Sequence, residues 1–487
     1  MKKHSLFKII LILIGLLVIT SWFVHGRQGD TAFLAIDDVA INYVQAFYYF
    51  FDTMVFVAVI GAFYGVLNKT GAYKKLLDTI TTKVKGKSKE FVIATIIIFA
   101  LLASITGMTL PLLIFIPFVI SIILLLGYDK LVAISSTIVA TLVGFTGGIF
   151  TTFRNPSYSY GYSATTFENL TGIEQYSNLF PKILLLVLGV GFLIFFCLKH
   201  IKNVENKKVK YELNEATDVM ITEVKGSYKD IKIWPMITVL SVVLVLLILG
   251  LIPWNDLFKI EVFENFHTWV VGLSIPEFKL FGLKFKEFPV FNNLIFGSMS
   301  AFGSWGTLGS FMVPIVILIF FCLLIKFIYK IKFDDAIDGF IEGVKKMLPS
   351  ALMIGLVYTV LICAYNNGFI ETIITSAAGT KMGLNVAIGS LISILGSLVY
   401  SDIYYVAAGT FLPIVEAVTD EALLPVFTLA FQSLYGLVSI VGPTSIMLVV
   451  ALTYLDVPYT TWVKYIWRFV VGLFILIFAI LLIVTLI

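Results

Sequence analysis

The chain has 487 residues, of which 59% are hydrophobic and only 13% are charged, and its formal net charge is +4. Soluble globular proteins carry about twice that charged fraction, so the composition argues against a soluble protein and for a membrane-embedded one. The three cysteines stand singly and the four histidines fall outside the apolar runs. This excludes a disulfide framework and disfavours an intramembrane metal site or histidine relay.

Nine apolar runs are long enough to cross the ~30 Å hydrocarbon core as single helices. The first follows Met1-Lys2-Lys3, but it is too long for a signal peptide and lacks a small-residue cleavage pattern, so we predict an uncleaved span. The nine predicted spans cover residues 6–24, 46–67, 131–153, 181–198, 235–252, 309–327, 347–365, 425–450 and 465–487.

Two further apolar stretches, 91–126 and 384–418, are each interrupted midway by small and polar residues. The interruptions are Ser104-Ile105-Thr106-Gly107 in the first and Ser401-Asp402 in the second. Each stretch is either a pair of full spans or a span with a re-entrant hairpin. Irregular backbone at membrane depth is tolerated only where it is buried in protein or lines a cavity.

Lysine distribution predicts the orientation of the chain, because cytoplasmic loops carry an excess of basic residues. Segment 68–90 has seven lysines, 199–233 has eight and 326–346 has five, so these segments and the N-terminus are predicted to be cytoplasmic. The C-terminus is then external, in a multi-pass protein of the plasma (inner) membrane. On this count the two interrupted stretches enter from opposite faces, as in an inverted-topology repeat.

A spacing match also indicates an internal repeat. Gly71 precedes Ser104 by 33 residues, and Gly368 precedes Ser401 by the same 33. After each interrupted stretch comes a span with a glycine-rich break and a proline. We therefore predict an all-α polytopic membrane protein with an inverted-topology repeat, two re-entrant hairpins and broken helices. The predicted parts are a first repeat (1–200), a cytoplasmic linker (201–233) and a second repeat (234–487). Segment 254–290 is amphipathic and is expected at the membrane interface, whereas 291–308 receives no assignment.

A helix that breaks within the membrane exposes backbone N–H groups at one new end and backbone C=O groups at the other. The N–H end suits a carboxylate and the C=O end suits Na⁺, so a break can bind a charged solute without any catalytic side chain. Asp402, an acid within an apolar stretch, is a functional candidate or a hairpin-tip residue that reaches water. Arg154 is a candidate for binding a carboxylate or an interfacial anchor. The glycines equally suit close helix packing. The candidate substrate- and ion-binding residues are Ser104, Thr106, Gly107, Thr109, Gly147, Gly148, Arg154, Asn155, Ser401, Asp402, Ser439, Gly442, Thr444 and Ser445.

The segments Ala430 to Gly436, Gly442 to Ser445 and Val457 to Lys464 resemble the last conserved block of YfcC-type permeases. Gly65 to Gly71 and Ala351 to Asn367 match elsewhere in that family. These permeases belong to the ion transporter superfamily, with anaerobic four-carbon dicarboxylate carriers and aminobenzoyl-glutamate transporters as relatives. The resemblance implies a scaffold part, a moving transport part, and two opposed hairpins that clasp substrate and cations.

The chain departs from that family's pattern at both hairpin tips, where Thr109-Leu110-Pro111 and Tyr400-Ser401-Asp402 stand. The added acid would suit an ammonium or guanidinium group better than a simple dicarboxylate.

The sequence favours a secondary active transporter, by cation coupling or exchange, of a small charged carboxylate metabolite, either an amino acid or a dicarboxylate. A channel-like permease is an alternative, and a membrane-embedded enzyme is a weaker one because no span holds a catalytic cluster. The expected partners are a small-molecule substrate and the lipid bilayer, with no nucleic acid, and a homodimer is left open. No cofactor is expected beyond Na⁺ or H⁺ as coupling ion, and no bound metal other than Na⁺ at the same breaks.

Overall fold

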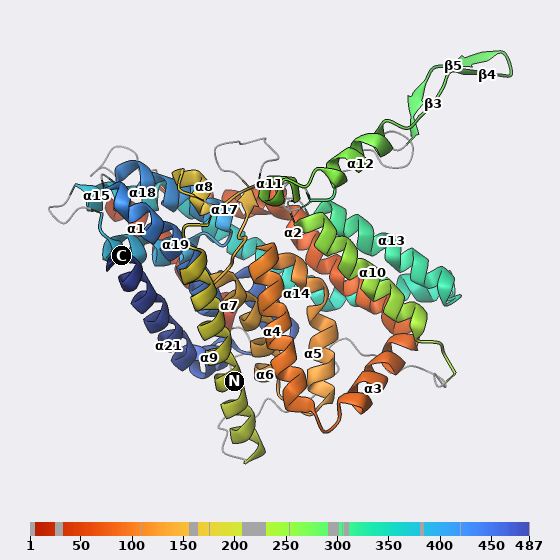
Figure 1. Ribbon diagram of the computed structural model, residues 1–487, viewed down its shortest axis with the longest axis horizontal. Helices are drawn as coiled ribbons and strands as arrows, with labels where there is room; N and C mark the ends of the chain where they lie inside the picture. Colours follow the sequence, from red (N-terminus) through yellow and green to blue (C-terminus); the bar gives the residue numbers. More distant parts are fainter. Residues whose placement is uncertain are drawn as a thin grey trace.

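The computed structural model describes residues 5–24, 33–107, 109–154, 164–174, 176–206, 230–252, 254–290, 301–303, 305, 311–379, 384–418 and 420–486. The described chain is a bundle of helices with one arm projecting from it (Figure 1). Seven of the described helices are long and apolar enough to cross a membrane, and seven shorter apolar helices accompany them. The three described β-sheets are two-stranded ribbons.

The first half of the chain holds two long helices, an interrupted pair and a broken helix. Its elements are α1 (Ser5–Val24), α2 (Ile36–Lys69), α3 (Ala72–Val84), α4 (Ser88–Thr106), η1 (Leu110–Ile114), α5 (Ile116–Leu125), α6 (Lys130–Ile134), the π-helical η2 (Ser135–Val139), α7 (Ala140–Thr146), β1 (Phe153–Arg154), β2 (Ala164–Thr165), α8 (Phe167–Thr171) and α9 (Leu179–Glu205).

The second half contains the arm, two long helices, an interrupted stretch and a broken helix. Its elements are α10 (Trp234–Leu251), α11 (Trp254–Phe258), α12 (Val262–Val271), β3 (Ser274–Ile275), β4 (Phe278–Leu280), β5 (Leu283–Phe285), β6 (Phe288–Pro289), α13 (Met312–Ile328), α14 (Phe333–Asn367), α15 (Phe369–Ala378), α16 (Val386–Val399), α17 (Ile403–Val406), the π-helical η4 (Ala407–Phe411), α18 (Leu412–Ala417), η5 (Glu421–Leu423), α19 (Leu424–Val441), α20 (Ile446–Tyr454) and α21 (Tyr459–Leu486).

Helices α2 and α14 are longer than the predicted spans 46–67 and 347–365, because polar segments beyond the apolar runs continue the same helices. They pack against each other through facing glycines. A Cβ on Gly61 would overlap the carbonyl oxygen of Gly343, and one on Gly65 would overlap that of Gly339. Small residues let helix backbones approach this closely. This packed pair, the spine, is followed in each half by a shorter helix, α3 or α15, and then by an interrupted stretch.

Both interrupted stretches are helix–break–helix units. Helix α4 ends at Gly107, whose φ of 68° is the left-handed conformation that glycine adopts most easily. The chain then returns through η1 and α5. Helix α16 ends at an extended segment, Tyr400–Asp402, and the chain returns through α17, η4 and α18, with α17 and η4 packed on α16. The predicted interruptions therefore lie where each unit reverses.

The broken helices α7 and α19 end at the predicted glycine-rich positions, and side chains from other helices satisfy their free carbonyls. The Gln432 amide donates to the carbonyl oxygens of Gly148 (2.7 Å) and Phe145 (3.3 Å) at the end of α7. The Tyr459 hydroxyl donates to Val441 (2.6 Å) and the Trp462 indole to Ile440 (3.0 Å) at the end of α19. Unpaired carbonyls in a dry interior are costly, so these bonds make the breaks stable.

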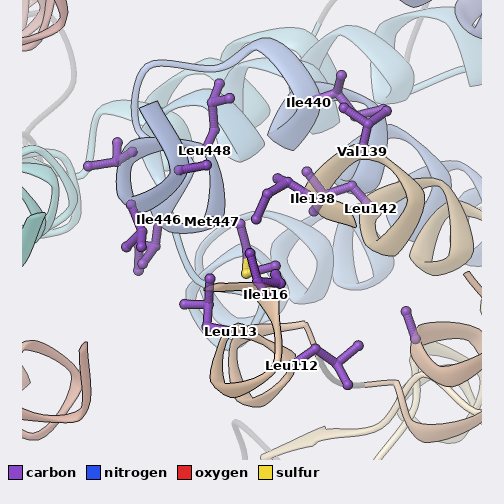
Figure 2. Packing of buried hydrophobic residues seen from close by; sticks show 14 of the residues in the cluster. Leu112, Leu113, Ile116, Ile138, Val139, Leu142, Ile440, Ile446, Met447 and Leu448 are labelled. Carbon is purple, nitrogen blue, oxygen red and sulfur yellow. The ribbon is translucent and has the colours of Figure 1, made fainter. Parts of the chain in front are cut away.

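Apolar side chains join the first interrupted unit to both broken helices. Figure 2 shows Met447 beside Leu113 and Ile116, and Val139 facing Ile440. These side chains belong to one buried core together with Leu112, Ile138, Leu142, Ile446 and Leu448. Residues from the two halves of the chain thus share one core.

The segment predicted to be amphipathic, 254–290, forms the arm in Figure 1, in which α12 leads to two short ribbons. Ribbon β4–β5 pairs Phe278 with Phe285 and Lys279 with Lys284, so apolar and basic side chains alternate between its faces. Most of segment 291–308, which the sequence does not assign, lies outside the described residues, as do 207–229 of the predicted linker. The division into two repeats and a linker stays a prediction.

Candidate functional site

A cavity of about 340 Å³ lies where the two interrupted units meet α2 and α14. Its volume is within the roughly 300–1,000 Å³ that small-molecule sites occupy. Half of the lining residues are aromatic. The lining residues are Tyr49, Phe50, Asp52, Thr53, Gly107, Thr109, Leu110, Pro111, Phe145, Thr152, Phe153, Trp305, Phe311, Pro314, Tyr358, Asp402, Ile403, Tyr404, Tyr405 and Tyr435.

Asp52 enters the cavity from α2, just after a distortion of that helix at Phe50, whose φ of −121° and ψ of 23° are not helical. One carboxylate oxygen accepts a hydrogen bond from the Thr53 amide (2.8 Å), and the other accepts one from the Phe311 amide (3.2 Å). The side chain is half-buried. These bonds hold the carboxylate in place and leave it acceptor capacity toward the cavity.

Asp402 lines the cavity from the start of α17. Its carboxylate caps that helix by accepting a hydrogen bond from the Tyr404 amide (2.8 Å). The preceding carbonyl, that of Ser401, accepts a hydrogen bond from the Tyr435 hydroxyl (3.1 Å). An N-cap aspartate is favoured by the helix dipole. The break between α16 and α17 therefore directs a fixed carboxylate into the cavity.

Stacked rings form part of the cavity wall. The rings of Phe50 and Tyr358 stack with centroids 3.7 Å apart and planes at 4°, and Phe50 lies 5.9 Å from Tyr405. The Tyr358 hydroxyl is 3.4 Å from that of Thr53. Aromatic faces attract cations, including ammonium and guanidinium groups. The wall is suited to a flat or cationic solute.

The charge of the lining is negative. It contains the two carboxylates of Asp52 and Asp402, and none of the twenty lining residues named above is Lys, Arg or His. Arg154 follows the lining residue Phe153 and pairs through its backbone with Ala164, but its side chain lies outside the described part. Buried carboxylates are stabilised by a positive partner.

The geometry of the cavity can be set beside known proteins. The family described as DcuC, C4-dicarboxylate anaerobic carrier, matches residues 8–486. The chain belongs to this family. It is therefore a multi-pass membrane transporter and not an enzyme. The resemblance to YfcC-type permeases and the prediction of an all-α polytopic membrane protein are both confirmed.

Two curated relatives cover most of the carrier. An uncharacterised protein of Haemophilus influenzae is 24% identical over 464 residues, which is 92% of this chain and 78% of the relative. An Escherichia coli protein named putative basic amino acid antiporter YfcC is 22% identical over 427 residues, 84% of this chain and 73% of its own. The solved YdaH transporter of Alcanivorax borkumensis is 14% identical with a TM-score of 0.37, and the match covers 99% of this chain and 98% of that one.

Three of the predicted binding residues of the carrier line the cavity: Gly107, Thr109 and Asp402. Ser401 lies beside Asp402, with its hydroxyl buried. The remaining predicted residues of the first half serve the fold. The Ser104 hydroxyl donates to the Gly147 carbonyl (3.1 Å), and the Thr106 hydroxyl donates within its own helix. Gly147 packs closely against α9. Gly148 is held by Gln432. Asn155 lies outside the described residues.

In the second half, the predicted residues of the α19 break also serve the fold. The Thr444 hydroxyl donates to the Leu398 carbonyl (2.5 Å) and joins the break to α16. Ser445 caps α20 by accepting from the Leu448 amide. Ser439 and Gly442 lie in and just after the last turn of α19 and do not line the cavity. The groups at these breaks that were predicted to face a substrate are thus largely engaged by protein.

Asp52 and the aromatic wall line the cavity but are not among the residues predicted from the sequence. Asp52 carried a signal, since it is an acid within an apolar run and such residues are costly unless they serve a function. The rings of Tyr358, Tyr405 and Tyr435 carried none, because tyrosines are common in membrane helices. Only the packing of distant segments places these rings around one space.

Proposed function

We propose that the carrier transports a small cationic metabolite, with a basic amino acid as the favoured substrate. The supporting observation is the cavity with two carboxylates, ten aromatic side chains and no basic side chain among its described lining. A substrate ammonium or guanidinium group would lie between Asp52 and Asp402 and against the rings. Arg154, next to the lining, is our candidate for holding the substrate carboxylate.

Electrostatics disfavours a dicarboxylate at this site. Two like charges about 4 Å apart repel by roughly 4 kcal/mol at an effective dielectric constant near 20. A dicarboxylate would bring two charges toward Asp52 and Asp402, whereas a basic amino acid brings cations to both. The printed name of the Escherichia coli relative, a putative basic amino acid antiporter, agrees with this choice.

The same argument bears on coupling. A cationic substrate and a coupling cation, H⁺ or Na⁺, would both be attracted to the two carboxylates of the cavity. Competition for these carboxylates would make the two occupancies mutually exclusive. Mutually exclusive occupancy produces exchange. We therefore propose that the carrier works as an antiporter, with its N-terminus in the cytoplasm of a cell whose plasma membrane it spans, alone or as a homodimer.

Thermal unfolding of the purified carrier tests the substrate class. We expect arginine, lysine and ornithine to raise the midpoint, and succinate, fumarate and malate to leave it unchanged. Asp402→Asn and Asp52→Asn should each abolish the shift, because each removes a counter-charge. Asp420→Asn is the matched control, since Asp420 is exposed and caps the short helix η5.

Transport is then measured in liposomes loaded with unlabelled arginine. Labelled arginine outside should accumulate by exchange in the parent and in Asp420→Asn, and not in Asp402→Asn. If dicarboxylates raise the midpoint and exchange while basic amino acids do neither, the proposed substrate class is wrong.

A further inference from the structure

Helix α16 carries three serines along one buried face, and a fourth serine follows the helix just before Asp402. Ser390, Ser393 and Ser397 lie in the helix and Ser401 lies after it, and each is at most 7% exposed. At 100° per residue the three helical serines fall within about 60° of one another around the helix axis. The face packs on α19 and η4.

The hydroxyls of these four serines have no hydrogen-bond partner. Several other buried helical hydroxyls of the carrier donate to the carbonyl one turn back. Such bonds are made at 2.7 to 2.9 Å by Ser121, Ser136, Thr137, Thr141 and Ser433. Among the buried serines of the other described helices, Ser350 alone shares the unpartnered state. Buried polar groups without a partner are costly, and a small polar ligand is the usual explanation.

Packing alone does not require these hydroxyls. The 33-residue match aligns Ser401 with Ser104, and so aligns Ser397, Ser393 and Ser390 with Ala100, Ile96 and Ile93 of α4. There, the Ala100 backbone lies against Gly144. The first interrupted unit thus has apolar residues at the positions aligned with the three helical serines, while Ser104, aligned with Ser401, donates to the Gly147 carbonyl. The row of unpartnered serines belongs to the unit that carries Asp402.

The spacing of the hydroxyls suits water. The three helical serines are successively three and four residues apart, which is about 4.5 to 6 Å along the axis. A water that bonds two hydroxyls at about 2.8 Å each, at a roughly tetrahedral angle, bridges oxygens about 4.5 Å apart. One end of the row is followed by Ser401 and the cavity residue Asp402, and the other end is five residues from Asn385, the half-buried N-cap of α16.

We infer that the serine face of α16 holds a single file of water that carries protons between the outer end of α16 and Asp402. A hydroxyl both donates and accepts, so a proton entering at Ser390 leaves at Ser401 as each hydrogen bond in the file shifts. The carboxylate of Asp402 accepts that proton when substrate leaves and returns it when substrate binds. The inference rests on the proposed function only for this last step.

Silver ions, which bind thiolates and pass where water passes, test the file without any substrate. Ser393→Cys and Ser397→Cys are compared with Ile392→Cys, at the same depth of α16 and 2% exposed, and Ala100→Cys, the aligned position on α4. The parent, with its three buried native cysteines, supplies the background. Free thiols are counted by maleimide mass shift after denaturation. We expect the two serine positions to react at least tenfold faster than the controls. Equal rates would overturn the inference.

Proton movement tests the role of the file. Ser393→Val replaces the hydroxyl with apolar methyl groups and so interrupts the file of water, and Ile392→Val is the control. Liposomes containing a pH-sensitive dye report protons moved on addition of arginine. We expect Ser393→Val to lower this flux at least tenfold while arginine still raises the unfolding midpoint, and an unchanged flux would overturn the inference. If the parent itself gives no response to arginine, the proposed substrate fails, and the silver rates still decide whether the file exists.

Discussion

The buried ion pair between α8 and α9 allows a sharp test of how the carrier is held together. The Lys182 ammonium lies 2.6 Å from the Glu168 carboxylate, and the two side chains are 3% and 1% exposed. Two unit charges at that distance attract by about 6 kcal/mol at an effective dielectric constant of 20, before desolvation is subtracted. Removing one partner leaves a buried charge alone, which costs about 3–5 kcal/mol.

We therefore expect Lys182→Met to lower the free energy of unfolding by about 3–5 kcal/mol. The double variant Lys182→Met with Glu168→Leu should recover most of this loss, because it removes both charges and fills the space with apolar side chains. The measurement is equilibrium unfolding in mixed micelles, followed by tryptophan fluorescence and completed as a double-mutant cycle.

A second ion pair supplies the control. The Lys89 ammonium lies 3.0 Å from the Glu205 carboxylate and joins α4 to α9, but the side chains are 46% and 48% exposed. Water screens such a pair, so Lys89→Met should leave the unfolding free energy unchanged. If Lys182→Met costs no more than Lys89→Met, burial does not govern the strength of these pairs, and the reasoning is refuted.

Three further substitutions test the breaks and the spine. Gln432→Leu should lower the unfolding free energy by about 1–3 kcal/mol, because it leaves the Gly148 carbonyl buried without a donor, whereas Gln432→Glu should be worse still. Gly343→Val should cost at least about 1–3 kcal/mol, since its side chain would overlap the Gly61 backbone, and Gly15→Val, in open space, should be neutral. Tyr435→Phe should cost only about 0.5–1.5 kcal/mol yet raise the KM for substrate in the exchange assay, because it frees the segment that positions Asp402.

Hydropathy is local, and it located most of the helices. The predicted spans 181–198, 235–252 and 309–327 correspond to α9, α10 and α13, which begin within three residues of the predictions. The two interruptions were also predictable, because Gly107 and Ser401-Asp402 break an apolar run where a helix of that composition would otherwise continue. The ends of α2 and α14 were not predicted. Their polar extensions are helical in the context of the paired spine, and hydropathy alone does not detect them.

The residues of the candidate site also divide into those predicted from the sequence and those that only tertiary packing brings together. Asp402 was found from the sequence, because a carboxylate within an apolar stretch is expensive wherever it lies. The α7 and α19 breaks were also predicted from the sequence, but the donors Gln432, Tyr459 and Trp462, which bond their backbone carbonyls from other helices, were not. The cost of removing a residue from water depends on that residue and on its neighbours in sequence. The sequence therefore determined the spans, the breaks and the acid within an apolar stretch. The partner that meets each polar group comes from a distant segment, as Phe311 does for Asp52, so only tertiary packing decided which groups are satisfied and which remain open to a ligand.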